Sequence, residues 1–183
     1  MSKKLSLDTL CLTAGWKPGK GEPRQLPIYQ STTFKYDTSE QMADLFDLKA
    51  AGYFYTRLQN PTSDFVAAKI CTLEGGTAAM LTSSGQAASL YSIINICSSG
   101  DHFVSSSTIY GGTYNLFDVT LRRMGIEVTF VDADASLEEL QKAFRPNTKA
   151  LFGEMIANPA IAVLDIEKMA RVAHKNGVPL VID

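Results

Sequence analysis

The sequence has almost no excess charge and no long apolar run. Its 183 residues include 17 basic and 19 acidic side chains, a formal net charge of -2, so nothing electrostatic points to nucleic acid or an anionic membrane surface as a partner. No window approaches the roughly 20 apolar residues that a membrane-spanning helix needs. The apolar fraction, 45%, is that of an ordinary globular domain with a substantial core. We therefore expect a small-molecule partner.

Cysteine and histidine are scarce. Cys11, Cys71 and Cys97 are far apart and show no metal-ligand spacing, so we expect neither a disulfide framework nor a metal site. Reduced thiols favour a cytoplasmic protein. His102 and His174 lack a nucleophile in any recognisable arrangement, and we expect both to be structural.

Three motifs of nucleotide-binding and hydrolytic enzymes are absent. The chain has no Gly-x-Gly-x-x-Gly after a strand, no Gly-x-x-x-x-Gly-Lys-Ser/Thr and no Gly-x-Ser-x-Gly. A doubly wound nucleotide-binding domain would therefore lack its usual phosphate cradle. That alternative predicts affinity for NAD or ATP.

The second half of the chain alternates apolar runs with segments of helical periodicity. Strands are predicted at 103–107, 126–131, 150–156 and 178–182, and helices at 114–124, 137–144 and 166–175. This pattern predicts an α/β fold, a mostly parallel sheet sandwiched by helices. Ligands of such sheets bind at the carboxyl ends of the strands, which selects residues 83–86, 105–110, 154–158 and Asp183.

The first 52 residues are predicted to form a separate arm. Up to residue 36 proline and glycine interrupt every periodicity, while Trp16 and Ile28 favour packing, for example on a second subunit. A short amphipathic helix is expected to begin at Thr38 and to stop at Gly52. We therefore divide the chain into an arm with intersubunit contacts, 1–52, and an α/β part, 53–183.

The stretch 78–90 predicts a site for a charged ligand. An apolar strand at 78–81 leads through a serine-rich turn into a helix. Backbone N–H groups of Gly85 and Gln86, the positive end of the helix dipole and the hydroxyl of Ser84 would converge there, which suits a phosphate. The same residues would also begin an ordinary serine-capped helix with no ligand.

A second candidate pair is Tyr55 and Arg57. Asn60-Pro61 forces a turn after them, and Thr62 is expected to cap a helix over 63–73. In an extended segment the two side chains would share a face, where a hydroxyl and a guanidinium suit a phosphate. A surface aromatic beside a solvated arginine is the alternative.

Taken together, these motifs resemble the Cys/Met-metabolism family of pyridoxal-phosphate enzymes, which has fold type I. The resemblance extends from Pro27 to the last residue and, within the family, is strongest to the O-acetylhomoserine sulfhydrylase branch. It rests on the order of Tyr55-Thr-Arg57, Asn60-Pro-Thr, Glu74-Gly-Gly, Ser83-Ser-Gly-Gln-Ala, Tyr110-Gly-Gly-Thr, Asn158-Pro and Val181-Ile-Asp183.

The resemblance implies a pyridoxal 5'-phosphate site in the large domain of this fold. Ser84, Gly85 and Gln86 would hold the phosphate, and Tyr55 and Arg57 would reach the phosphate of a neighbouring subunit's site.

The ring of the cofactor would be held by three further residues. Tyr110 would stack on the pyridine ring and place its hydroxyl near the reacting carbons, as a catalytic residue. Asn158 would approach the 3-hydroxyl, and Asp183 would keep the ring nitrogen protonated.

The implied activity is gamma-replacement on O-acetyl-L-homoserine by sulfide or a thiol, giving homocysteine or methionine and acetate. The implied assembly is a cytoplasmic homotetramer, a dimer of dimers, in methionine biosynthesis. Two alternatives stay open. One is a methionine gamma-lyase or cystathionine gamma-synthase type of reaction, and the other is a non-catalytic fragment or subunit that contributes Tyr55 and Arg57 to a partner.

One part of the family pattern is missing from these residues. The family's Schiff-base lysine follows Ser-x-Thr a short way beyond the strand that ends in Asp183, and the arginine for the substrate carboxylate comes later still. No lysine here stands in that context, including Lys69, Lys142, Lys149, Lys168 and Lys175. We expect the chain to be the N-terminal part of a longer polypeptide, truncated within its sheet and inactive alone.

Overall fold

The computed structural model describes residues 5–183, which fold as two compact units. The first unit ends at Leu81 and the second spans Thr82–Asp183. The first contains α1 (Leu7–Thr13), α2 (Ser39–Phe46) and α3 (Pro61–Glu74). The second contains the helices α4 (Gly85–Ile94), α5 (Gly111–Asn115), α6 (Leu137–Lys142) and α7 (Ile166–Lys175), the π-helix η1 (Leu116–Leu121), and the strands β1 (His102–Ser106), β2 (Glu127–Val131), β3 (Thr148–Gly153) and β4 (Leu180–Ile182).

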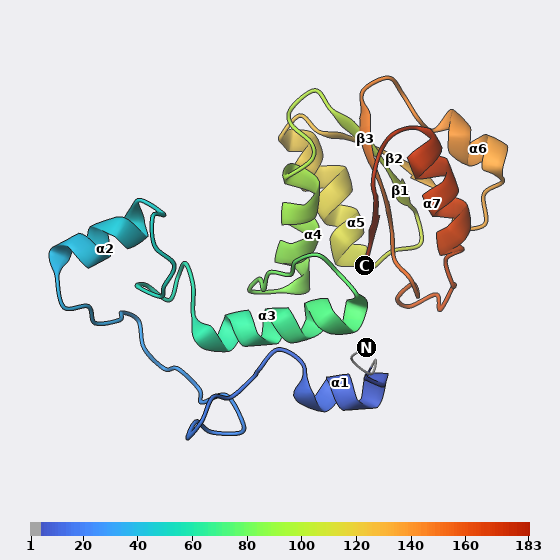
Figure 1. The fold of residues 1–183 in the computed structure, drawn as a ribbon. Coiled ribbons are helices and arrows are strands. Elements are labelled where there is room, and N and C mark those ends of the chain that lie inside the picture. The colour runs from blue at the N-terminus through green and yellow to red at the C-terminus, as the bar shows by residue number, and fades with distance from the viewer. Residues whose placement is uncertain (1–4) are drawn as a thin grey trace. The chain divides into compact units, whose positions relative to one another are not determined.

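The second unit is built on one parallel sheet, as the sequence predicts. Its strand order is β2-β1-β3-β4, and all three neighbouring pairs are parallel. Helices α4 and α5 lie on one side of the sheet and α6 and α7 on the other (Figure 1). The sheet therefore has the sandwiched α/β architecture of the prediction, and its strands all end at the same edge.

Alternation along the central strands supplies two separate apolar cores. Phe103 of β1 faces the core beneath α4 and η1, whereas its neighbour Val104 faces the core beneath α6 and α7, because successive strand residues point to opposite faces. On β3, Phe152 and Leu151 divide in the same way. All four side chains are essentially inaccessible to solvent, which fixes the register of the two strands that carry the site.

Helix ends in the second unit follow local sequence signals. Ser136 caps α6 in a capping box with Glu139, and hydrogen bonds from Ser136 lower the pKa of that carboxyl. Asp165 caps α7, which has the predicted bounds. The predicted helix 114–124 instead combines α5 with the π-helical η1.

The first unit departs from the predictions in three places. The arm contains α1, with Ser6 as its N-cap, although we expected no helix before residue 36. Helix α2 has the predicted cap, Thr38, but ends at Phe46, well before Gly52. Helix α3 is capped by Asn60, because the Thr62 hydroxyl accepts a hydrogen bond from the Tyr29 N–H (3.0 Å) instead.

The apolar run 78–81 does not form the predicted strand. Met80 is 76% exposed, and no described strand pairs with this segment. An apolar run gives hydrophobicity but not a hydrogen-bonding partner, and a strand needs both. Among residues 5–183, no helix combines the length and apolar character that crossing a membrane requires.

Candidate functional site at the carboxyl edge of the sheet

Three predicted site residues lie together where β1, β3 and β4 end. Glu154, the residue after β3, links two of them: its carboxylate accepts hydrogen bonds from the backbone N–H groups of Tyr110 (2.6 Å) and Asn158 (3.2 Å). We call Tyr110, Glu154, Asn158 and Asp183 the carboxyl edge. Tyr110 comes from the loop between β1 and α5, and Asn158 from the loop after β3, so two distant segments meet at one carboxylate.

Asp183 continues the pairing of β4 with β3 into this edge. Its N–H donates to the carbonyl of Gly153 (2.9 Å), and its carbonyl accepts from the N–H of Met155 (2.8 Å). The two bonds flank Glu154, so the backbone of Asp183 is fixed beside it. Asp183, the last residue of the sequence, is exposed in the described residues.

Gly112 brings Gln86 into the same neighbourhood. A Cβ atom built on Gly112 would collide with Nε2 of Gln86 and would lie 2.5 Å from Cε1 of Tyr110. A side chain at this position would force the Gln86 amide or the Tyr110 ring to shift. Gly112 thus lets the first turn of α4 lie next to the aromatic ring of the carboxyl edge.

The first turn of α4 has the properties of an anion site. Ser84 is the N-cap, and its Oγ accepts from the N–H of Ala87 (3.1 Å). The N–H groups of Gly85 and Gln86 lie in the turn where a helix offers no internal acceptor. A Cβ on Gly85 would meet no atom within 4 Å, so a ligand can approach the backbone closely.

The charge pattern of α4 also favours an anion. Helices α2, α3 and α7 each carry an acidic residue in the first turn, whereas α4 carries none. A carboxylate there would occupy the positive end of the dipole and repel an incoming phosphate. The residues present at this edge therefore fit a phosphorylated aromatic cofactor: free N–H groups for the phosphate, an exposed aromatic ring at Tyr110 and an exposed carboxylate at Asp183.

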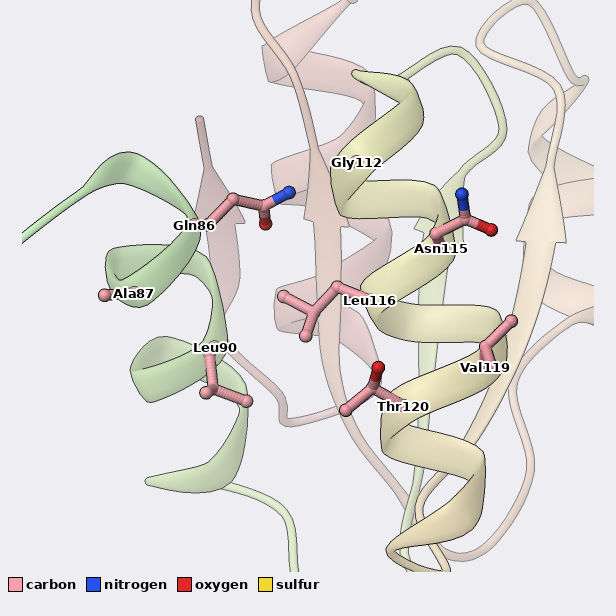
Figure 2. Close-up of a pocket in the computed structure, with 8 residues that line it drawn as sticks. All are labelled: Gln86, Ala87, Leu90, Gly112, Asn115, Leu116, Val119 and Thr120. Carbon is pink, nitrogen blue, oxygen red and sulfur yellow. The ribbon is translucent and has the colours of Figure 1, made fainter.

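A cavity of about 460 Å³ lies between α4 and the helix formed by α5 and η1 (Figure 2). It shares Gln86 and Gly112 with the neighbourhood described above, and Leu90 and Leu116 project into it. None of its eight lining side chains can ionise, so it offers space for packing rather than groups for acid–base chemistry. Nor do three His, Cys, Asp or Glu side chains gather into a metal site anywhere in residues 5–183.

Tyr55 and Arg57 belong to the first unit and meet each other. The segment is not extended as predicted, because Tyr55 forms a bridge with Thr33 and the chain then turns, with the N–H of Leu58 donating to the Tyr55 carbonyl (3.0 Å). The turn places the guanidinium carbon of Arg57 5.3 Å from the centre of the Tyr55 ring. The aromatic ring and the guanidinium thus stay close, by a cation–π contact rather than by alternation.

Two residues of this neighbourhood were not assigned roles from the sequence. Glu154 was placed only in a segment at the end of a strand, and Gly112 appeared only within the Tyr110-Gly-Gly-Thr motif. A glutamate directly after a buried strand is a weak signal, and its partner Tyr110 is 44 residues away. No local pattern predicts that contact.

Comparison with known proteins gives consistent matches along the chain. Residues 8–183 match the family described as Cys/Met metabolism PLP-dependent enzyme. An O-acetyl-L-homoserine sulfhydrylase of Corynebacterium glutamicum is 51% identical over 160 residues, covering 87% of this chain and 37% of that protein. A homocysteine/cysteine synthase of Kluyveromyces lactis is 46% identical over 178 residues, covering 96% and 40%.

A solved structure agrees with these matches. A Campylobacter jejuni protein described as an O-acetylhomoserine (thiol)-lyase, carrying N'-pyridoxyl-lysine-5'-monophosphate, superimposes with a TM-score of 0.91 at 38% identity. The match covers 98% of this chain and 44% of that one. The chain thus spans about two fifths of the length of the relatives it matches.

Proposed function

The chain belongs to the Cys/Met metabolism PLP-dependent enzyme family, and from this premise we propose that the whole protein catalyses gamma-replacement on O-acetyl-L-homoserine. Sulfide or a thiol displaces acetate, giving homocysteine or methionine. The observation that carries the proposal is the carboxyl edge, where Glu154 joins the segments of Tyr110 and Asn158 beside Asp183. The names of the two similar proteins from Corynebacterium glutamicum and Kluyveromyces lactis support the choice of reaction.

In this proposal the described residues hold pyridoxal 5'-phosphate at both ends. The N–H groups of Gly85 and Gln86, with the hydroxyl of Ser84, bind the phosphate, and Asp183 pairs with the ring nitrogen. When bound, the cofactor supplies an electron-accepting ring that stabilises a carbanion beside the substrate's amino group. Asp183 supports this by holding a proton on the ring nitrogen.

The remaining two residues orient the ring. Tyr110 covers one face of it and keeps its hydroxyl near the substrate carbons that lose protons, and Asn158 contacts the 3-hydroxyl. Tyr110 is 49% exposed, which is compatible with such stacking. These side chains bind and orient the reacting groups and exclude water from one face of the site.

We also propose that Tyr55 and Arg57 serve a neighbouring subunit. The guanidinium of Arg57 contacts the ring of Tyr55, and in our proposal the guanidinium and the tyrosine hydroxyl both bind a phosphate oxygen. The arm 1–52 makes intersubunit contacts in a homotetramer, a dimer of dimers, and 53–183 begins the cofactor-binding domain. Three large apolar residues of the arm that are at least three quarters exposed support such contacts, namely Leu12, Ile28 and Leu48.

A cytoplasmic location is part of the proposal. Cys11, Cys71 and Cys97 are all free thiols. Burial and the nearby Asp101 raise the pKa of the Cys97 thiol to about 11, so it stays protonated and unreactive.

Product analysis of the whole protein separates gamma-replacement from elimination. With O-acetylhomoserine and sulfide, we expect acetate and homocysteine to appear in equal amounts. Methionine alone, the substrate of the alternative gamma-lyase reaction, should give little 2-oxo acid. Rapid formation of 2-oxo acid from methionine, with no homocysteine from the ester, would assign the protein to elimination instead.

A further inference from the structure

Glu154 occupies a junction between two loops of the carboxyl edge. Its side chain lies partly buried after β3, and its two carboxylate oxygens accept from two different loops: Oε2 from the N–H of Tyr110 and Oε1 from the N–H of Asn158. These are the residues assigned to the face of the cofactor ring and to its 3-hydroxyl. We propose that Glu154 is a positioning residue that fixes Tyr110 relative to Asn158, an inference that rests on the proposed function.

The backbone around Glu154 is itself fixed. Bonds from Asp183 to Gly153 and from Met155 to Asp183 hold both neighbours of Glu154 against the end of β4. Gly153 is buried within β3, one of the two central strands of the sheet. The backbone that carries the carboxylate is therefore held in place by the sheet. In our proposal, the positions of the loops that contain Tyr110 and Asn158 depend on their hydrogen bonds to this carboxylate.

A carboxylate is the group that this junction needs. Each N–H requires an acceptor, and an ionised carboxylate offers two equivalent oxygens whose charge shortens and strengthens both bonds. The 2.6 Å bond to Tyr110 is slightly shorter than the usual N–H···O distance of about 2.7–3.2 Å. Glutamine has one acceptor oxygen, and its NH2 group would face the second N–H donor to donor.

Both carboxylate oxygens of Glu154 are engaged with the protein itself, because each accepts from the backbone N–H of a different loop. Glu154 acts through Tyr110 and Asn158. Its loss should lower kcat more than it raises KM, because the orientation of the reacting part is disturbed while the phosphate site on α4 is untouched.

The test uses the whole protein and the variants Glu154→Gln and Glu154→Ala. Hydrogen exchange at the amides of Tyr110 and Asn158, measured without substrate, should speed up at one of them in Glu154→Gln and at both in Glu154→Ala. The value of kcat/KM should fall about 10- to 100-fold in Glu154→Gln, mainly in kcat. Glu167→Gln, an exposed glutamate of α7, is the matched control and should change neither quantity.

Each outcome decides the proposal. Unchanged exchange at both amides would overturn it, and so would faster exchange with unchanged kcat/KM. Loss of exchange protection throughout β1 and β3 would also overturn it, because that result would show a merely structural role. Absence of pyridoxal-phosphate-dependent activity in the unsubstituted protein would instead refute the proposed function. The exchange result would still report on the two Glu154 bonds in that case.

Discussion

At the scale of the residue, the site depends on one hydrogen-bond acceptor and on one position without a side chain. Glu154 satisfies two N–H groups with one side chain, and Gly112 leaves room for the Gln86 amide and the Tyr110 ring. Neither residue is assigned to contact the cofactor. Both determine where the residues that would contact it can lie, so their substitution should affect activity more than folding.

Two adjacent glycines allow this to be measured. Gly111 and Gly112 both lie in the first turn of α5, but a Cβ on Gly111 would meet nothing within 4 Å. Gly112→Ala should displace Tyr110 or Gln86 and lower kcat/KM about tenfold or more. Gly111→Ala should leave kcat/KM unchanged and stabilise the protein by up to about 1 kcal/mol, because alanine favours a helix. Equal kinetics for the two variants would contradict the steric role of Gly112.

Sequence patterns predicted which segments meet at the edge of the sheet better than they predicted the contacts that join those segments. Asp183, Asn158 and Tyr110 follow strands, and parallel strands end at one edge, so their proximity could be expected. The bonds through Glu154 could not, because they depend on the path of two loops. The predicted face shared by Tyr55 and Arg57 failed for a similar reason, since a turn follows Tyr55.

At the scale of the element, His102 joins three strands. It is fully buried at the start of β1, with Nδ1 2.7 Å from the Thr148 hydroxyl on β3 and Nε2 2.9 Å from the Thr129 hydroxyl on β2. This agrees with the structural role expected for it. Burial, with the nearby positive charge of Arg145, lowers the pKa of His102 from 6.5 to about 4.

The shift predicts a pH dependence of stability. Between pH 4 and 6.5 the unfolded chain binds a proton at His102 and the folded chain does not, so stability falls as the pH is lowered through this window. The loss attributable to His102 should approach about 3 kcal/mol. Urea unfolding at several pH values should show this slope reduced in His102→Gln and retained in His174→Gln, whose histidine is exposed. An unchanged slope in His102→Gln would assign the dependence to other groups.

Elements with strong local signals were predicted closely. The helix 166–175 has its predicted bounds because an aspartate cap and an Asn-Gly stop define both ends. Two predictions were wrong: that no helix precedes residue 36, where α1 forms, and that residues 78–81 form a strand. A seven-residue helix carries little periodicity, and whether an apolar run forms a strand depends on a partner elsewhere in the fold.

At the scale of the whole molecule, three lysines of the described residues have partners away from the carboxyl edge. Lys69 donates to the carbonyl of Cys11 (3.0 Å), and Lys168 donates to the carbonyls of Ala133 (3.2 Å) and Ala135 (3.1 Å). Lys149 lies 3.9 Å from Asp101. These contacts hold none of the three lysines at the carboxyl edge. This agrees with the sequence, in which no lysine follows the family's Ser-x-Thr pattern.

A chemical trapping experiment tests that assignment. The 183-residue chain, mixed with pyridoxal 5'-phosphate and reduced with borohydride, should show scattered and substoichiometric labelling by peptide mass spectrometry. The whole protein, treated in the same way, should show one fully labelled lysine in a Ser-x-Thr-Lys context. A single stoichiometric adduct within the 183 residues, accompanied by turnover, would refute the assignment.

The central claim is that the carboxyl edge and the first turn of α4 hold the two ends of one cofactor. A crystal structure of the whole protein with pyridoxal 5'-phosphate tests it most directly. We predict phosphate oxygens within hydrogen-bonding distance of the Gly85 and Gln86 N–H groups and the ring nitrogen against the Asp183 carboxylate. Density for the cofactor elsewhere, or a ring nitrogen directed away from Asp183, would contradict the account.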